Sequence, residues 1–126
     1  MAIPSELLQT WVNAIKNGDP KQVTSLYHQD GILLGTFSAA ERVGHELILE
    51  YFVNLLKNPV EVDIISEHLH CFIKSPNSPN ATSVNSGLYN FVTEGKTIKA
   101  RFSFVYTKSG EEWKIISHHS SILPET

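Results

Sequence analysis

Cysteine is almost absent from this sequence, since Cys71 is the only one among 126 residues. A single thiol excludes an internal disulfide and fits a reducing compartment. Basic residues are also few, because ten Lys and Arg are scattered without a run that could follow a phosphate backbone, so we expect no nucleic-acid partner. Long apolar runs and a basic, apolar leader are missing as well. We therefore expect a soluble, cytoplasmic protein with no membrane contact.

The composition is that of an ordinary globular domain. Apolar residues make up 41% of the chain and charged residues 18%, and the length suffices for a sizeable core. A net charge of −3 is too small to imply a particular partner. We expect one domain over residues 1–126.

The N-terminal half predicts three helices. Apolar residues spaced by three and four from Leu7 to Ile15 form one helix face, which Gly18 closes. Asp19 with Pro20 is a start signal for a second, short helix that should end near His28, ahead of the turn residues Asp30 and Gly31. A third helix is expected from about His45 to Lys57, with Tyr51 on its buried face.

Strand patterns fill the rest. A short strand is expected over residues 32–34. Four longer ones follow near Val60–Lys74, Ala81–Thr93, Thr97–Lys108 and Trp113–Ser121. A long polar connection at residues 75–80 joins the first two of these, and hairpin turns at 94–96 and 109–112 join the others.

Helices followed by a long antiparallel sheet predict an α+β fold, in which the curved sheet wraps around the three helices and leaves a pocket between them. The opposite sheet face still carries bulky and polar residues. A homodimer would cover that face.

The last predicted strand ends in four polar residues, His118 to Ser121. Side chains alternate along a strand, so His118 and Ser120 share one face, while His119 and Ser121 share the other. One pair must face inward, where an imidazole and a hydroxyl need hydrogen-bond partners. We take this end as the candidate site; the pattern does not decide which pair faces inward.

The histidines do not form a complete set of metal ligands in the sequence. His68 and His70 share one face of a predicted strand, and Cys71 points away from it. Two ligands fall short of the three that a catalytic zinc ion takes from the protein. His28 and His45 lie near predicted helix ends, where we expect them to be solvated. We therefore expect neither a metal nor another cofactor.

Several stretches carry a family resemblance that covers almost the whole chain: Leu33-Leu-Gly-Thr36, Glu50-Tyr-Phe52, Ser86-Gly-Leu-Tyr-Asn-Phe91, Ala100-Arg-Phe-Ser-Phe-Val-Tyr106 and His118-His-Ser-Ser-Ile-Leu-Pro-Glu125. The chain resembles the nuclear-transport-factor-two-like superfamily, a cone-shaped fold shared with SnoaL-like proteins. More narrowly, it is similar to bacterial relatives of the association domain of calcium/calmodulin-dependent protein kinase II. The Leu-Leu-Gly-Thr, Tyr-Phe and His-His-Ser-Ser motifs resemble the iota-class carbonic anhydrases.

The enzyme-class resemblance implies a metal-independent carbonic anhydrase that converts carbon dioxide to bicarbonate. By motif it implies that hydroxyls of Thr36, Tyr51 and Ser120 bind bicarbonate and that His118 lies close by. Preorganised hydroxyl donors would stabilise the developing anion. Either His118 or Tyr51 would accept the proton, and this choice stays open.

Two other functions compete with this one. The first is a non-catalytic oligomerisation module that binds small carboxylates, like the kinase association domain; it would favour an arginine cluster in the pocket. Arg101 suits an intersubunit contact and is left outside the site. The second is a SnoaL-like cyclase or isomerase, which would need a carboxylate base inside the cone, whereas the acidic residues here fall mostly in turns and on exposed helix faces.

Overall fold

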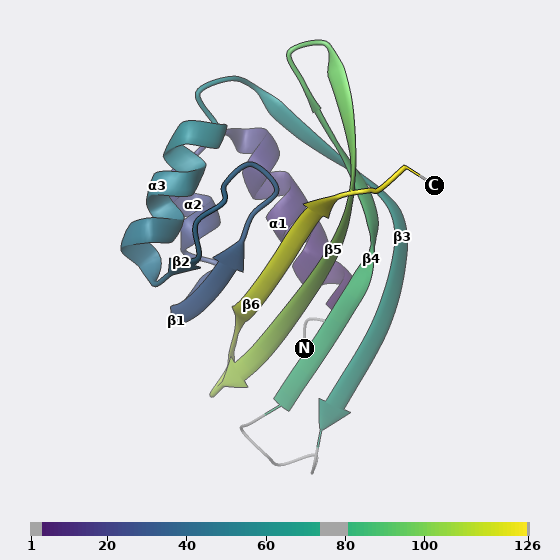
Figure 1. Ribbon diagram of the computed structural model, residues 1–126. Coiled ribbons are helices and arrows are strands. Elements are labelled where there is room, and N and C mark those ends of the chain that lie inside the picture. Colours follow the sequence, from purple (N-terminus) through teal and green to yellow (C-terminus); the bar gives the residue numbers. More distant parts are fainter. Residues whose placement is uncertain (1–3, 74–80, 126) are drawn as a thin grey trace.

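The computed structural model describes residues 4–73 and 81–125, which form three helices and six strands (Figure 1). The helices are α1 (Pro4–Asn17), α2 (Pro20–Thr24) and α3 (His45–Leu55). The strands are β1 (Tyr27–Leu34), β2 (Arg42–Val43), β3 (Val60–Ile73), β4 (Ala81–Thr93), β5 (Lys96–Ser109) and β6 (Glu112–Ile122). The predicted connection at residues 75–80 lies outside the described residues.

The strands form one curved sheet in the order β2-β1-β6-β5-β4-β3, and the helices lie against one of its faces (Figure 1). The expectation of a curved-sheet α+β fold is confirmed. The expectation that the sheet is antiparallel throughout is wrong at one place, because β1 pairs with β6 in parallel, with Leu33 opposite His118. No hairpin joins these two strands, so nothing local forces them to be antiparallel.

The second helix is shorter than the pattern indicated. It ends at Thr24, and β1 begins at Tyr27 rather than at residue 32. Gly31 does not break the chain: it lies inside β1, where a Cβ atom would come 2.9 Å from the carbonyl oxygen of Ile115. The glycine thus permits the close approach of β6, at the irregularity in the β1–β6 register. The sequence pattern did not predict the two-residue strand β2.

The core lies between the helices and the concave face of the sheet. On β5, alternate residues from Ala100 to Tyr106 are buried. Helix α1 contributes Leu8, Trp11 and Ile15 to the same core. Within the described residues, none of the helices has the length and apolarity needed to cross a membrane.

Candidate functional site

An irregularity in β6 decides which of its terminal polar residues face the core. The register with β5 shifts between Val105 and Tyr106, so inward-facing Ile115 is followed by inward-facing His118 instead of residue 117. His118 is 2% exposed and Ser120 4% exposed, whereas His119 is exposed. The alternative left open by the sequence is thus resolved in favour of His118 and Ser120.

The His118 ring contacts a different tyrosine through each of its nitrogens. Nδ1 lies 2.7 Å from the hydroxyl of Tyr27, and Nε2 lies 3.2 Å from the hydroxyl of Tyr89. The ring stacks on Phe104, with 3.9 Å between ring centroids. Burial, helped by the nearby His119, lowers the pKa of His118 to about 3. The imidazole is therefore neutral near pH 7.

Ser120 connects this buried group to the loop after β1. The Tyr89 hydroxyl donates to Ser120 Oγ at 2.5 Å, and Ser120 Oγ lies 2.5 Å from Thr36 Oγ1. The parallel pairing, with Leu34 opposite His119, carries Thr36 to the end of β6. Two of the residues named from the sequence therefore touch directly.

Tyr51 approaches the same region from α3. Its hydroxyl accepts a hydrogen bond of 3.4 Å from the backbone N–H of Phe37. Gly35 makes room for the ring, since a Cβ atom there would overlap its edge. Burial raises the pKa of Tyr51 to about 12, although the Phe37 hydrogen bond and the charge of Arg42 act in the opposite direction.

Ser120 lines two separate spaces, one together with Tyr51 and the other together with Thr36. Tyr51 and Ser120 line a closed cavity of about 10 Å³ together with His118, which is room for about one water molecule. Thr36 and Ser120 line a shallow pocket of about 360 Å³ on the other side.

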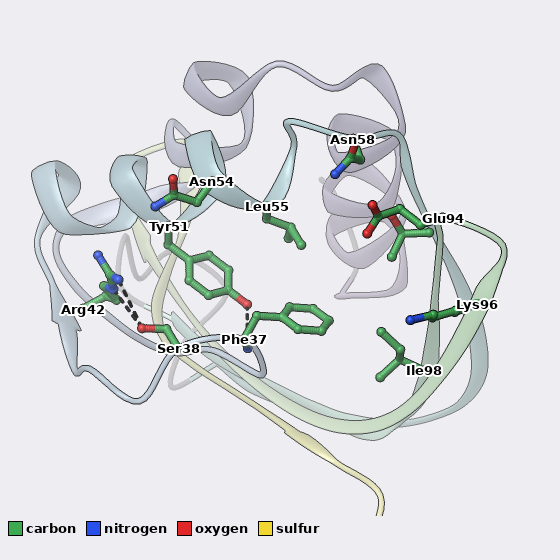
Figure 2. Close-up of a pocket in the computed structure, with 11 residues that line it drawn as sticks. Phe37, Ser38, Arg42, Tyr51, Asn54, Leu55, Asn58, Glu94, Lys96 and Ile98 are labelled. Atoms are coloured by element: carbon green, nitrogen blue, oxygen red, sulfur yellow. Dashed lines mark hydrogen bonds between the residues drawn. The ribbon is translucent and has the colours of Figure 1, made fainter.

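Tyr51 also lines a larger pocket of about 430 Å³ between α3, the loop after β1 and the β4–β5 hairpin (Figure 2). Arg42 and Lys96 lie on its opposite sides (Figure 2). The Arg42 guanidinium bonds Glu50 at 2.9 Å and the Ser38 hydroxyl at 3.1 Å. Its charge is thus already partly compensated.

The histidines at positions 28, 45, 68 and 70 do not line the three pockets described above. His68 and His70 are exposed on β3, as is Cys71, and the described residues contain no group of three His, Cys, Asp or Glu arranged to hold a metal ion. His45 is half-buried, and its Nε2 lies 2.7 Å from the carbonyl oxygen of Tyr27, so this ring is only partly exposed to solvent. His28 is half-buried and accepts a hydrogen bond from the backbone N–H of Asp30.

Sequence reasoning missed Tyr27 and Tyr89 as members of the site. Tyr27 was assigned to a helix, and its contact with His118 depends on the parallel pairing of β1 with β6. Tyr89 lies on the buried, odd-numbered face of β4, which is visible as alternation in the sequence. That pattern shows burial, but it cannot show which polar group a tyrosine will reach.

Comparison with known proteins identifies the family. The model of the calcium/calmodulin-dependent protein kinase II association domain matches residues 5–124. A structure from Xanthomonas campestris, named as a candidate domain of this kind, is 32% identical, with a TM-score of 0.86 and coverage of 100% of this chain and 95% of that one. No curated protein matches the chain.

More distant structures share the fold. A candidate ketosteroid isomerase from Parabacteroides distasonis is 22% identical, with a TM-score of 0.76 and coverage of 97% of this chain and 89% of that one. A candidate dehydratase of the nuclear-transport-factor-two-like family from Streptomyces avermitilis is 14% identical, with a TM-score of 0.75 and coverage of 96% and 94%. The chain has the nuclear-transport-factor-two-like fold and belongs to the calcium/calmodulin-dependent protein kinase II association domain family.

Proposed function

We propose that this protein is a carbonic anhydrase that hydrates carbon dioxide without a protein-bound metal, holding bicarbonate through the hydroxyls of Thr36, Tyr51 and Ser120. One observation supports this most directly: Ser120 Oγ bonds Thr36 at 2.5 Å and lines the same small cavity as Tyr51. Side chains from α3, β6 and the loop after β1 thus bring neutral hydroxyl-bearing groups to the same region of the protein. Such groups suit an oxyanion, which accepts hydrogen bonds.

In the proposed reaction, a water molecule in the site attacks the carbon of carbon dioxide. A new C–O bond forms, and one C=O π bond opens to leave negative charge on oxygen. The hydroxyls of Thr36 and Tyr51 donate hydrogen bonds to that oxygen. These hydrogen bonds become stronger as negative charge develops in the transition state. The low-dielectric surroundings make these interactions stronger than they are in bulk water.

The proton released by the attacking water goes to solvent or buffer in this scheme. The pKa of about 3 for His118 makes its imidazole a poor acceptor near pH 7, and a pKa of about 12 keeps Tyr51 in its phenol form. His118 therefore assists by holding its neighbours in place. A rate that increases with buffer concentration is the expected consequence.

Substrate entry requires the loop after β1 to move. Carbon dioxide needs more room than the closed cavity of about 10 Å³ offers. Phe37 lines the larger pocket, and its ring packs edge-on against Phe91, which lines the small cavity; Phe37 nevertheless remains 41% exposed. In the proposal, displacement of Phe37 joins the cavity of about 10 Å³ to the pocket of about 430 Å³, both of which Tyr51 lines.

The experiment compares Ser120→Ala with Ser121→Ala in stopped-flow carbon dioxide hydration. Ser121 is the matched control, because it is the next residue on β6 and faces outward. Ser120→Ala removes the hydroxyl that bonds Thr36 in the site, so it should lose most of its activity, whereas Ser121→Ala should keep it. Equal activity of both variants would contradict the residue assignment.

A second function is favoured by a different observation. Arg42 and Lys96 lie in the wall of the pocket of about 430 Å³, which suits a small carboxylate. Association-domain family membership suggests an oligomeric module, and in this alternative the pocket binds its ligand without turnover. Acetate or butyrate binding that Arg42→Gln abolishes, in a protein without hydration activity, would support it.

The isomerase reading has less support. Among the residues lining the pocket next to Tyr51, Glu94 supplies the only carboxylate, and its side chain is exposed on the β4–β5 turn. A general base for proton abstraction works best in a site that raises its pKa by burial. We therefore rank this reaction below the other two.

A further inference from the structure

A continuous chain of hydrogen bonds crosses the core and ends at the proposed site. It contains six side chains from α1, β1, β6, β4 and the loop after β1. In order, they are Trp11, Tyr27, His118, Tyr89, Ser120 and Thr36. The first five are buried, and only Thr36 is partly exposed.

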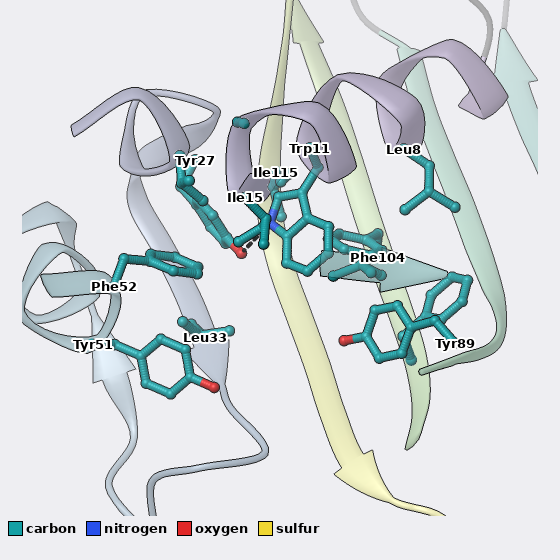
Figure 3. Packing of buried hydrophobic residues seen from close by; sticks show 14 of the residues in the cluster. Leu8, Trp11, Ile15, Tyr27, Leu33, Tyr51, Phe52, Tyr89, Phe104 and Ile115 are labelled. Carbon is teal, nitrogen blue, oxygen red and sulfur yellow. Dashed lines mark hydrogen bonds between the residues drawn. The ribbon is translucent and has the colours of Figure 1, made fainter. Parts of the chain in front are cut away.

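The first bond of the chain has only one direction. An indole N–H can donate and cannot accept, and Trp11 Nε1 lies 3.2 Å from the Tyr27 oxygen (Figure 3). Tyr27 therefore accepts from Trp11, and its own hydrogen is available for His118 Nδ1 at 2.7 Å. Nδ1 is then the acceptor of the ring.

The remaining bonds follow from this one. A neutral imidazole carries one proton, so with Nδ1 accepting, the proton lies on Nε2. Nε2–H donates to the Tyr89 oxygen, and the Tyr89 hydroxyl donates to Ser120. Ser120 in turn directs its hydrogen at Thr36, 2.5 Å away. The hydrogen of Thr36 is left without a partner in the chain.

We propose that Trp11, Tyr27 and Tyr89 are positioning residues that act through His118 to make Thr36 a hydrogen-bond donor toward the bound oxyanion. This rests on the proposed function, and it specifies how that site distinguishes an acceptor ligand from a donor. With the chain reversed, Thr36 would direct lone pairs at the anion. The chain does not conduct protons to solvent, because it ends at the buried indole of Trp11.

The test reads the tautomer of His118 by 15N-edited NMR of the full chain, with His118→Gln assigning the signal. Wild type should show the proton on Nε2. Tyr27→Phe removes the donor to Nδ1, so the proton should redistribute between the two nitrogens. Tyr89→Phe leaves the Tyr27 contact intact, so the Nε2–H tautomer should persist while the link to Ser120 is lost.

Tyr106→Phe is the matched control, because Tyr106 is buried in the same core and its hydroxyl has no hydrogen-bond partner among the residues that the structure describes. We expect Tyr27→Phe and Tyr89→Phe to lower kcat for hydration by about tenfold each. Tyr106→Phe should change neither the tautomer nor kcat. If the three tyrosines served packing alone, the three variants would have the same His118 tautomer and the same kcat.

The outcomes separate the two proposals. A wild-type proton on Nδ1, or full kcat in Tyr89→Phe, would overturn the positioning inference while leaving the proposed reaction standing. A wild-type protein that does not hydrate carbon dioxide would overturn the reaction. In that case the tautomers of wild type and Tyr27→Phe still decide whether the chain has the direction described.

Discussion

The hydroxyl oxygens of Thr36 and Ser120 lie 2.5 Å apart, although 84 positions separate them in the sequence. They meet because β1 runs parallel to β6, so the C-terminal ends of both strands lie at the same end of the sheet. The loop after β1 then turns Thr36 toward the last inward-facing residue of β6. The proposed site thus depends on the one parallel pairing among the described strands.

The contact between Gly35 and the Tyr51 ring gives a first prediction. A Cβ atom at position 35 would overlap the ring, so Gly35→Ala should displace Tyr51 and destabilise the fold by about 1–3 kcal/mol, the usual cost of overpacking. Hydration activity should fall with it. Urea unfolding and stopped-flow assays measure the two effects.

A double-mutant cycle supplies the control for this prediction. In a Tyr51→Ala background the ring is gone, and Gly35→Ala should then cost little more. Equal destabilisation by Gly35→Ala in both backgrounds would show that the Tyr51 ring does not require the glycine.

The lowered pKa of His118 predicts a pH dependence of stability. The pKa falls from 6.5 to about 3 on folding. Between these values the unfolded chain binds a proton that the folded chain does not, so the free energy of unfolding decreases as pH falls, by up to about 1.4 kcal/mol per pH unit. His118→Gln should remove this contribution, so the difference between the free energies of unfolding in urea at pH 5 and pH 7 should become smaller.

His119→Gln is the control, because His119 neighbours His118 in sequence but is exposed. It should retain the difference in stability between the two pH values. A wild-type protein whose unfolding free energy is the same at pH 5 and pH 7 would contradict the buried, neutral state of His118.

Elements with local signals were predictable from the sequence, and those built by distant pairing were not. The spacing around Trp11 and the Gly95 turn predicted α1 and the β4–β5 hairpin, because helix periodicity and turn chemistry are local. The parallel position of β1 depends on β6, almost ninety positions further along the chain. The inward direction of His118 depends on a register shift against β5, which alternation within β6 cannot reveal.

The outward face of the sheet predicts self-association, and we propose that it forms a homodimer. Val84 and Val105 lie opposite each other on this face, and both are half-buried in one chain. Light scattering should give a mass of twice the 14.1 kDa of one chain. Val105→Lys should reduce it to a single chain, because a charge would be buried at the interface.

Thr97→Lys adds the same charge at an exposed position near the β4–β5 turn and should leave the association unchanged. A wild-type mass of 14.1 kDa would contradict self-association. A Val105→Lys protein that still associates would show that the interface lies elsewhere.

The central claim is that neutral hydroxyl groups around Ser120 hydrate carbon dioxide without a bound metal ion. The most direct test is stopped-flow hydration with a pH indicator, on protein dialysed against a strong chelator and assayed for its metal content. We predict that the metal-free protein keeps its activity, and that Tyr51→Phe loses most of it while remaining folded. No acceleration over buffer, with or without added zinc, would contradict the account.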